Sequence, residues 1–308
     1  MSRYGEICLA VYRPDPELLG RQLASIANQS HRSWTCHVAI DGHDPATFKL
    51  VSDSVGGDAR FILHHYADNI GFYRNFERAV ENVTPRASWV ALSDQDDFWY
   101  TNKLERMIST LEREQATAVV CQARVVSREG QALSSTGRRS SSPTGLFYNN
   151  QVTGSLAVFR PDVVSLSLPF PPPTDAAYHD HWLGVCSQAL GKIYYLEDVM
   201  QDYVQHTANV LGEERGNRLG RRTKDLFLAT RRLGGVADYL AEHRWGWRVR
   251  MAREVLNRRP SSDPLLHAIA AGRMTSQLAA DLGRSARQRE VPLSRALALA
   301  VGSLRYSD

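Results

Sequence analysis

The chain has 308 residues, of which 43% are hydrophobic and 23% are charged, and its net charge at pH 7 is +4. These values are ordinary for a soluble globular protein, and the length suits two domains or one large domain with an appendage. The longest apolar stretch, near residues 296–304, is far shorter than the roughly 20 residues of a membrane-spanning helix, which excludes an integral membrane protein.

The four cysteines are scattered and form no CxxC pair, which argues against a disulfide framework or a zinc site. The apolar run from Ile7 to Tyr12 is too short for a signal peptide. We therefore expect a cytoplasmic protein, or one bound peripherally to the inner face of the cell membrane.

Apolar periodicity in the first 120 residues predicts alternating strands and helices. In chain order the expected elements are strand 6–11, helix 17–28, strand 35–40, helix 47–55, strand 60–64, helix 71–81, strand 89–92 and helix 103–113. This alternation predicts an α/β fold with a mostly parallel sheet and flanking helices.

Three of the predicted strands end in residues suited to ligand binding, which are Tyr12, Asp41-Gly42 and the acidic run Asp94 to Asp97. In parallel sheets the ligand lies beyond the carboxyl ends of the strands. We therefore expect these three positions to share one site.

The second half of the chain has a different texture. Ser134 to Thr144 is rich in serine and arginine and predicts a loop, whereas His179 to Leu190 predicts a helix. From about residue 215 the sequence becomes helical and arginine-rich. We predict a domain over residues 1–214 and a helical extension over residues 215–308.

The strongest chemical signal is the acidic run, in which Asp94, Asp96 and Asp97 bring three carboxylates within four positions. Carboxylates at alternate positions after a strand can hold Mg²⁺ or Mn²⁺, which prefer oxygen ligands and leave positions open for phosphates. The alternative is a solvated acidic turn that caps the following helix.

Together these segments resemble a family 2 glycosyltransferase of the GT-A fold, in its bacterial rhamnosyltransferase-like branch. The matching segments, in order, are Val11-Tyr12, Ser25 to Ser30, Asp41-Gly42, Asn69 to Gly71, Asn75-Phe76, Ser93 to Trp99, Lys103-Leu104, Gly154 to Phe159, His179 to Trp182, Gln205-His206 and Asn209 to Gly212. No Walker A sequence and no GxGxxG motif is present, so a glycine-rich loop is not expected to hold the phosphates.

The resemblance implies a nucleotide-sugar site. Tyr12 would stack on the base, Asp41 would accept a hydrogen bond from it, and Asp94 would face the ribose and the metal. Asn69 and Arg74 would complete the donor site, the arginine by contacting phosphate.

The resemblance also implies a metal site, in which Asp96 would bind Mg²⁺ or Mn²⁺ together with Asp94 and His206. A divalent cation would neutralise the charge that develops on the departing diphosphate. A lone histidine such as His206 is otherwise usually structural.

Asp180 is the expected catalytic base, which would remove the proton of the acceptor hydroxyl in an inverting transfer. The plainer reading is that Asp180 only caps the helix that begins near it. Five further residues are expected to contact the sugar or the acceptor, although the tryptophans and the glycine could equally serve packing: Trp99, Gly154, His179, His181 and Trp182.

We therefore predict a metal-dependent glycosyltransferase that moves a sugar to a glycan or lipid-linked acceptor. The expected pathway is cell-surface polysaccharide synthesis, such as that of O-antigen. The resemblance to the rhamnosyltransferase-like branch implies rhamnose from dTDP-rhamnose as the donor. The arginine-rich region, with Leu226 to Leu228 between basic pairs, suggests contact with an anionic membrane, and no nucleic-acid motif is present. The alternatives are a sugar nucleotidyltransferase and a non-catalytic nucleotide-sugar or glycan-binding protein. For the basic region, the alternative is a solvated helical appendage or an oligomer contact.

Overall fold

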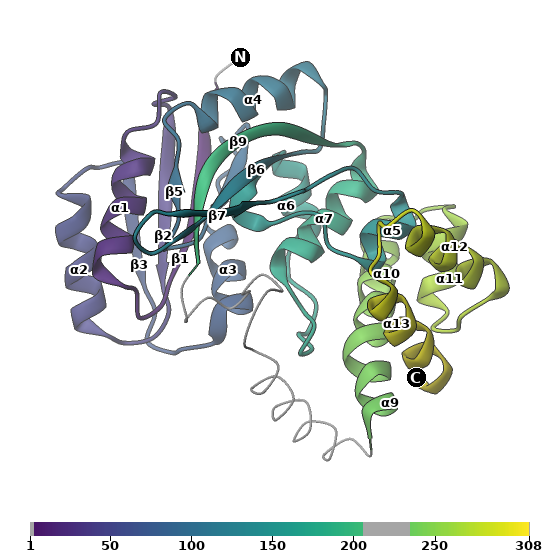
Figure 1. Ribbon diagram of the computed structural model, residues 1–308. Coiled ribbons are helices and arrows are strands. Elements are labelled where there is room, and N and C mark those ends of the chain that lie inside the picture. Colours follow the sequence, from purple (N-terminus) through teal and green to yellow (C-terminus); the bar gives the residue numbers. More distant parts are fainter. Residues whose placement is uncertain (1–2, 206–234, 308) are drawn as a thin grey trace. The chain divides into compact units, whose positions relative to one another are not determined.

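The structure, a computed structural model, describes residues 3–205 and 235–307 (Figure 1). These residues divide into two compact units, which are described separately. Unit 1 contains residues 3–140, 152–170 and 186–205, and unit 2 contains residues 141–151, 171–185 and 235–307. The predicted domain boundary near residue 215 lies outside the described residues and stays a prediction.

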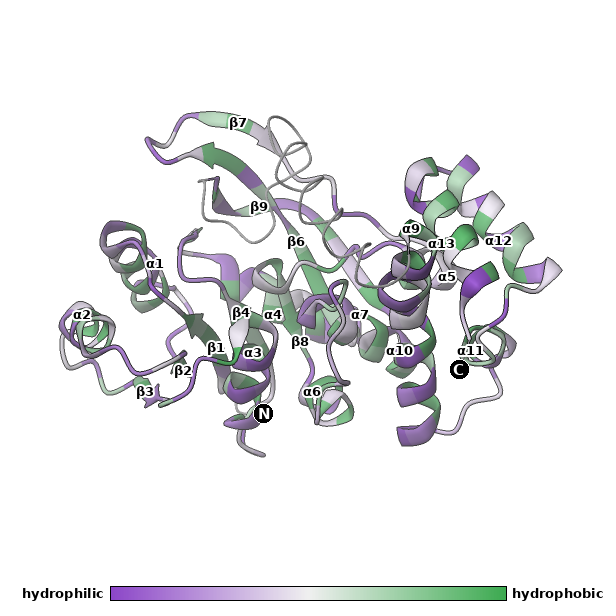
Figure 2. Cartoon of the chain, turned by 90° about the horizontal axis from the view of Figure 1, so that it is seen from below, coloured by the Kyte–Doolittle hydropathy of each residue, from purple (hydrophilic) through white to green (hydrophobic). Residues whose placement is uncertain are grey.

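Unit 1 is built on a sheet that has nine strands within the described residues, in the order β3-β2-β1-β4-β8-β6-β9-β5, with β7 paired to β6 (Figure 1). The strands are β1 (Gly5–Val11), β2 (Trp34–Ile40), β3 (Phe61–His65), β4 (Val90–Ser93), β5 (Phe98–Trp99), β6 (Ala118–Ser127), β7 (Ala132–Ser135), β8 (Ala157–Phe159) and β9 (Ile193–Gln205). In Figure 2, hydrophobic residues occupy much of β6, as expected for a strand covered on both faces.

The predicted α/β fold class is confirmed. Strands β1 to β4 pair in parallel, as the alternating pattern indicated. Strand β8 then joins β4 and β6 in the antiparallel direction, and the short strands β5 and β7 are also antiparallel to their neighbours. The second half of the sheet is therefore mixed.

The helices of unit 1 connect these strands, and two of them begin at a capping aspartate. They are α1 (Pro16–Ala27), α2 (Pro45–Val55), α3 (Gly71–Glu81), α4 (Lys103–Arg113), the 3₁₀ turn η1 (Gly154–Leu156) and α6 (Pro161–Ser167). Asp15 and Asp44 cap α1 and α2, and each is followed by a proline that presets the helical φ angle. Helix α3 packs on β1 and β2, and α4 packs on β6, β8 and β9.

Strand register brings the predicted ligand-binding positions to one edge. Val11 of β1 lies opposite Ile40 of β2, and Leu9 of β1 lies opposite Ser93 of β4. The residues that follow these strand ends are therefore neighbours, as the parallel arrangement requires.

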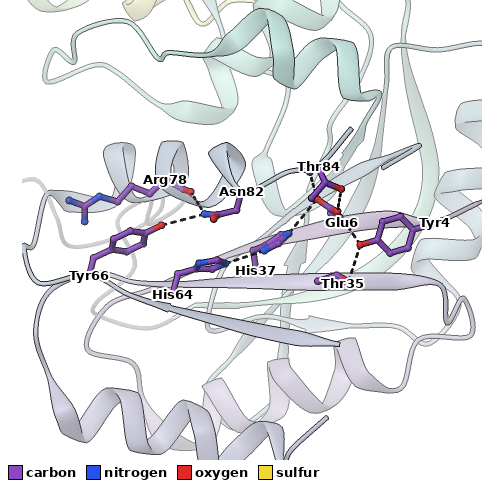
Figure 3. A network of polar contacts seen from close by, with 9 residues as sticks. All are labelled: Tyr4, Glu6, Thr35, His37, His64, Tyr66, Arg78, Asn82 and Thr84. Atoms are coloured by element: carbon purple, nitrogen blue, oxygen red, sulfur yellow. Dashed lines mark hydrogen bonds and ion pairs between the residues drawn. The ribbon is translucent and has the colours of Figure 1, made fainter. Parts of the chain in front are cut away.

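A buried polar network joins β1, β2 and β3 to the segment after α3 (Figure 3). The carboxylate of Glu6, which is fully buried, accepts hydrogen bonds from the backbone N–H and hydroxyl of Thr84 at 2.7 and 2.6 Å and from the Tyr4 hydroxyl at 3.0 Å. His37 lies 3.3 Å from the same carboxylate and 3.1 Å from His64. A buried charge is tolerated here because donors surround it.

Unit 2 is helical within the described residues. Its elements are α5 (Pro143–Tyr148), α9 (Val236–Tyr239), the π-helical turn η2 (Leu240–Trp245), α10 (Gly246–Arg258), α11 (Pro264–Ala270), α12 (Ser276–Arg287) and α13 (Leu293–Arg305). Helix α7 (His179–Leu190) begins in unit 2. Trp245 and Trp247 are fully buried in the core of unit 2. No helix among residues 3–205 and 235–307 is long and apolar enough to cross a membrane.

Candidate active site

The acidic loop, defined here as residues 94–97, follows β4 directly. Asp94 and Asp96 are half-buried, whereas Asp97 is 1% exposed. Asp97 accepts a hydrogen bond from Nε2 of Gln201 at 2.8 Å, and its Oδ1 has no hydrogen-bond donor among the described residues. Burial, and then the nearby charges of Asp94 and Asp96, raise the pKa of Asp97 well above its ordinary value. The nearby Lys103 ammonium group acts on the same carboxyl in the opposite direction.

A buried lysine lies beneath this loop. The ammonium group of Lys103 donates to the Ser155 carbonyl at 2.6 Å and to Oε1 of Gln201, and it lies 4.0 Å from the centroid of the Trp99 ring. Burial lowers the pKa of Lys103 to about 8. Gln201, which is fully buried in β9, thus bridges the lysine to Asp97. We did not single out Gln201 in the sequence, because no motif marks it.

Three buried polar residues support the segment around the acidic loop, namely Gln22 and Ser25 of helix α1 and Gln29 just after it. Their hydrogen bonds run from Gln22 Nε2 to Ser93 Oγ at 2.7 Å, from the Trp99 N–H to Ser25 Oγ at 3.1 Å and from Gln29 Nε2 to the Tyr100 carbonyl at 2.9 Å. The segment from Ser25 to Ser30 entered the sequence analysis only as part of a motif. The structure gives a physical reason for its polar residues, since buried amide and hydroxyl groups fix the path of the loop.

Tyr12 lies at the end of β1 and is 44% exposed. Its backbone N–H donates to Gln95 Oε1 at 2.8 Å, and Gln95 Nε2 donates to the Tyr12 carbonyl at 3.1 Å. This reciprocal pair ties the acidic loop to the end of β1. Tyr12 therefore has an accessible ring beside the loop, which suits the predicted stacking role.

Asp41 lies at the end of β2 and is 3% exposed. Its two oxygens accept hydrogen bonds from the backbone N–H groups of Ile70 and Gly71 at 2.9 and 3.0 Å, and Arg78 lies 3.6 Å away. Asp41 therefore anchors the start of α3 in this structure, and its predicted hydrogen bond to a base stays a prediction.

Asn69 is exposed beside Gly42, where a Cβ atom built on the glycine would lie 3.3 Å from that of Asn69. The φ angle of Gly42 is +88°, which favours glycine. The structure thus brings Asn69 to the end of β2, next to Asp41.

Arg74 has protein partners in unit 1. It forms an ion pair with Glu77 and donates to the Phe170 carbonyl at 3.1 Å. Arg160, another arginine of unit 1, pairs with Asp162. Gly154 begins the η1 turn and is buried. The predicted roles of Arg74 and Gly154 in binding stay predictions.

Asp180 lies in the first turn of α7, in unit 2, and is 3% exposed. Its Oδ1 accepts hydrogen bonds from Nδ2 of Asn150 at 2.9 Å and from the backbone N–H of His181 at 2.7 Å. Asn150 is a second residue that sequence reasoning missed. Both donors stabilise the charged form of the carboxylate.

The two histidines beside Asp180 are both buried. Burial lowers the pKa of His179 and that of His181 to about 3, so both rings are neutral near pH 7 and add no positive charge beside Asp180. Nε2 of the His181 ring lies 2.9 Å from the carbonyl oxygen of Leu146. His181 therefore contacts Asp180 through its backbone, and its ring is used inside unit 2.

The two tryptophans predicted to stack on sugars lie in the cores of their units. Trp99 is 1% exposed in unit 1, and Trp182 is fully buried in unit 2 with the guanidinium of Arg258 5.1 Å from its ring centroid. Large aromatic rings bury much apolar area, which explains why these positions pack inward. In this structure neither ring face is open to a sugar.

The residues of the acidic loop fit a divalent cation. Burial, and then the charges of Asp94 and Asp96, raise the pKa of Asp97, whose buried Oδ1 has no donor within residues 3–205 and 235–307. Among the described residues, however, no three histidine, cysteine or acidic side chains are grouped so that they could hold an ion by themselves. His206, the third predicted ligand, lies outside the described residues.

Comparison with known proteins gives a family and several related folds. The model of glycosyl transferase family 2 matches residues 6–166, and no curated protein sequence matches the chain significantly. The structure of S. aureus TarS 1-349 in complex with UDP-GlcNAc has a TM-score of 0.53 and 12% identity, over 98% of this chain and 89% of that one. Mannosyltransferase PcManGT from Pyrobaculum calidifontis, in complex with GDP-Man and Mn²⁺, has a TM-score of 0.52 and 16% identity, over 98% and 87%. At these identities the likeness concerns the fold.

Proposed function

The chain belongs to glycosyl transferase family 2, and from this we propose that it transfers a sugar from a nucleotide-diphosphate donor to an acceptor hydroxyl with inversion at the anomeric carbon. The observation that carries the proposal is the shared edge of β1, β2 and β4. There an accessible tyrosine ring, a buried aspartate and an acidic loop follow neighbouring strand ends. Ligands of parallel sheets bind at this edge.

In the proposed donor site, Tyr12 stacks on the base and Asn69 lies near the end of β2, where Asp41 holds the start of α3. Asp94 and Asp96 would hold Mg²⁺ or Mn²⁺. When bound, the cation supplies positive charge opposite the departing diphosphate. The protein itself fixes the acidic loop from below through Gln201 and Lys103, so the carboxylates need little rearrangement on binding.

In the proposed acceptor step, Asp180 removes the proton of the attacking hydroxyl. The proton moves to the carboxylate while the new bond to the anomeric carbon forms and the bond to the diphosphate oxygen breaks. The hydrogen bonds from Asn150 and from the His181 backbone favour the charged carboxylate that this step needs.

The donor sugar, the acceptor and the pathway form the finer part of the proposal. The resemblance to the rhamnosyltransferase-like branch favours rhamnose from dTDP-rhamnose and a glycan or lipid-linked acceptor in cell-surface polysaccharide synthesis. The related folds were solved with UDP-GlcNAc and GDP-Man, so those donors belong in the same test.

The experiment is a screen that measures nucleotide diphosphate released from dTDP-rhamnose, UDP-GlcNAc and GDP-mannose with Mg²⁺, Mn²⁺ or EDTA. We expect one donor to turn over in the presence of metal, and we expect EDTA and Asp96→Ala to abolish turnover. The matched control is Asp53→Ala, because the Asp53 side chain is 64% exposed on α2. Full activity of Asp96→Ala in EDTA would refute the metal role.

We also propose a peripheral contact with an anionic membrane. Helix α13 packs on η2 through Gly302, where an added Cβ would lie 2.6 Å from the Leu240 carbonyl oxygen. Large apolar side chains lie on its exposed side instead, with exposures of 42–83%: Leu293, Leu297, Val301 and Leu304. Arg305 follows them with its side chain 65% exposed. An apolar stripe with a neighbouring cation suits an anionic lipid surface.

The membrane contact is tested by sedimentation with phosphatidylglycerol vesicles at low salt. Leu297→Asp should reduce binding, whereas Leu133→Asp, at an exposed position of β7, should leave it unchanged. Absence of binding by the wild-type chain at low salt would refute this contact. The basic segment 221–232 that first suggested it lies outside the described residues.

A further inference from the structure

Asp180 is held by a neighbour that comes from a separate segment of unit 2. Asn150 donates through Nδ2 to Asp180 Oδ1 at 2.9 Å, and the His181 backbone N–H reaches the same oxygen at 2.7 Å. Asn150 is only partly buried and follows α5 by two residues. Its position therefore depends on what fixes the end of α5.

The residue before it, Asn149, is fixed by the C-terminal part of unit 2. Asn149 Nδ2 donates to the Glu290 carbonyl at 2.7 Å, and Arg295 of α13 donates to Asn149 Oδ1. The backbone N–H of Asn149 also donates to the Gly145 carbonyl at 2.8 Å, which closes the last turn of α5. The amide of Asn149 is thus held from both of its ends.

The rest of α5 is held in the same way. The carboxylate of Glu290 accepts from the backbone N–H of Ser142 at 3.0 Å and from its hydroxyl at 2.7 Å, at the start of the helix. At the other end the buried guanidinium of Arg248 donates to the carbonyls of Phe147 and Tyr148 at 3.2 and 3.0 Å. A six-residue helix has too little internal hydrogen bonding to hold itself, so these contacts set its place.

We propose that Asn150 is a positioning residue for Asp180, and that the C-terminal helices, through Glu290 and Arg295, hold Asn150 in place. This inference rests on the proposed role of Asp180 as the base. It gives the helical region of unit 2 a task in the transfer reaction, namely to orient one carboxylate oxygen so that the other can approach the acceptor hydroxyl. Precise orientation of a base is worth large factors in rate.

The first test reads the Asp180 carboxyl itself, without turnover. ¹³C NMR of aspartate-labelled protein, with Asp180→Asn for assignment, gives its pKa in the wild-type chain. Asn150→Ala should raise that pKa, because a hydrogen bond to the charged form is lost. Asn257→Ala, at an exposed asparagine of α10, is the matched control and should not move it. An unchanged pKa in Asn150→Ala overturns the proposal.

The second test uses kinetics with the donor found in the screen. Asn150→Ala should lower kcat by about 10- to 100-fold while the donor KM stays within about twofold. Asn150→Asp keeps the side-chain shape but has no N–H donor, so it should lose at least as much and serves where alanine disturbs the loop. A raised KM with unchanged kcat, or a wild-type kcat in both variants, overturns the positioning role.

The third test addresses the support from α13. Arg295→Ala should lower kcat by about 3- to 10-fold and raise the pKa of Asp180 in the same direction as Asn150→Ala. Arg284→Ala is the control, because that side chain is 61% exposed on α12. Wild-type behaviour of Arg295→Ala overturns the supporting role of α13.

These readouts separate the two proposals. If Asp180→Asn keeps full turnover, the proposed base is wrong, and the positioning role falls with it. If Asp180→Asn is inactive while the Asn150 variants match the wild type, only the positioning role is wrong. A shifted carboxyl pKa in a chain that turns over no donor supports the positioning contact and contradicts the proposed function.

Discussion

The two units hold their important carboxylates in opposite ways. Unit 1 gathers three aspartates in one loop, where burial, and then the charges of Asp94 and Asp96, raise the pKa of Asp97. One buried oxygen of Asp97 has no donor among the described residues. In unit 2, Asp180 accepts two hydrogen bonds at its Oδ1 and lies beside two histidines that are neutral near pH 7. In the proposed function, the acidic loop of unit 1 binds a cation, whereas Asp180 of unit 2 accepts a proton.

The largest effect should come from removing the Asp180 carboxylate. Asp180→Asn should lower kcat by about 10²- to 10⁴-fold, the usual contribution of a general base, and should leave donor affinity unchanged. Released nucleotide diphosphate and calorimetric titration of the donor measure the two quantities. If donor affinity falls as much as kcat, the division of labour between the units is wrong.

The next effect concerns the buried lysine that lies beneath the acidic loop. Lys103→Met should lower the free energy of unfolding by about 3 kcal/mol, because it leaves the Ser155 carbonyl and Gln201 Oε1 without their buried donor. Urea denaturation measures this loss. Lys192→Met is the control, since that side chain is 57% exposed. Equal losses in the two variants would contradict a special role for the buried lysine.

Acid should destabilise unit 2 more than unit 1. His179 and His181 have pKa values of about 3, below the ordinary 6.5, so their contribution is complete above pH 6.5 and is lost as the pH falls towards 3. Between about pH 7.5 and 5.5 each should cost about 1.4 kcal/mol. In unit 1, burial and then the nearby His37 lower the pKa of His64, so His64 also loses its contribution to stability as the pH falls.

Hydrogen exchange at about pH 7.5 and 5.5 checks this difference, because it reports the stability of each unit separately. We expect protection to fall more in α5 and α7 than in β1 to β3. In unit 1, His64→Gln should remove only the pH dependence of protection around the network of Glu6, His37 and residue 64. Equal loss of protection in both units would contradict the assignment of the acid-sensitive groups.

The smallest effects come from matched helix caps. Asp15 accepts from the backbone of α1 in unit 1, and Thr275 accepts from that of α12 in unit 2. Asp15→Ala and Thr275→Ala should each cost about 1 kcal/mol. Scanning calorimetry then shows whether the two changes shift one transition or two. A single shared shift would mean that the units unfold together.

Sequence reasoning succeeded for the parts of the fold that local order determines. Helices and strands of unit 1 follow from apolar periodicity and proline starts, and the positions after β1, β2 and β4 follow from the rule for parallel sheets. The family motifs added Asp180 as the predicted catalytic base. The same reasoning gave Trp99 and Trp182 a possible place on the surface, although both are buried. Aromatic residues near a motif look alike in sequence whether they pack inward or face a ligand.

What the sequence determines by itself is the order of the strand ends, and thus that Tyr12, Asp41 and Asp94 meet at one edge, because parallel strands always align their carboxyl ends. Only the tertiary structure decides which buried groups support the carboxylates. Gln201 is 104 residues from Asp97, and Asn150 is 30 residues from Asp180. Such partners depend on strand register and helix packing, which bring distant residues together without leaving a local pattern in the chain.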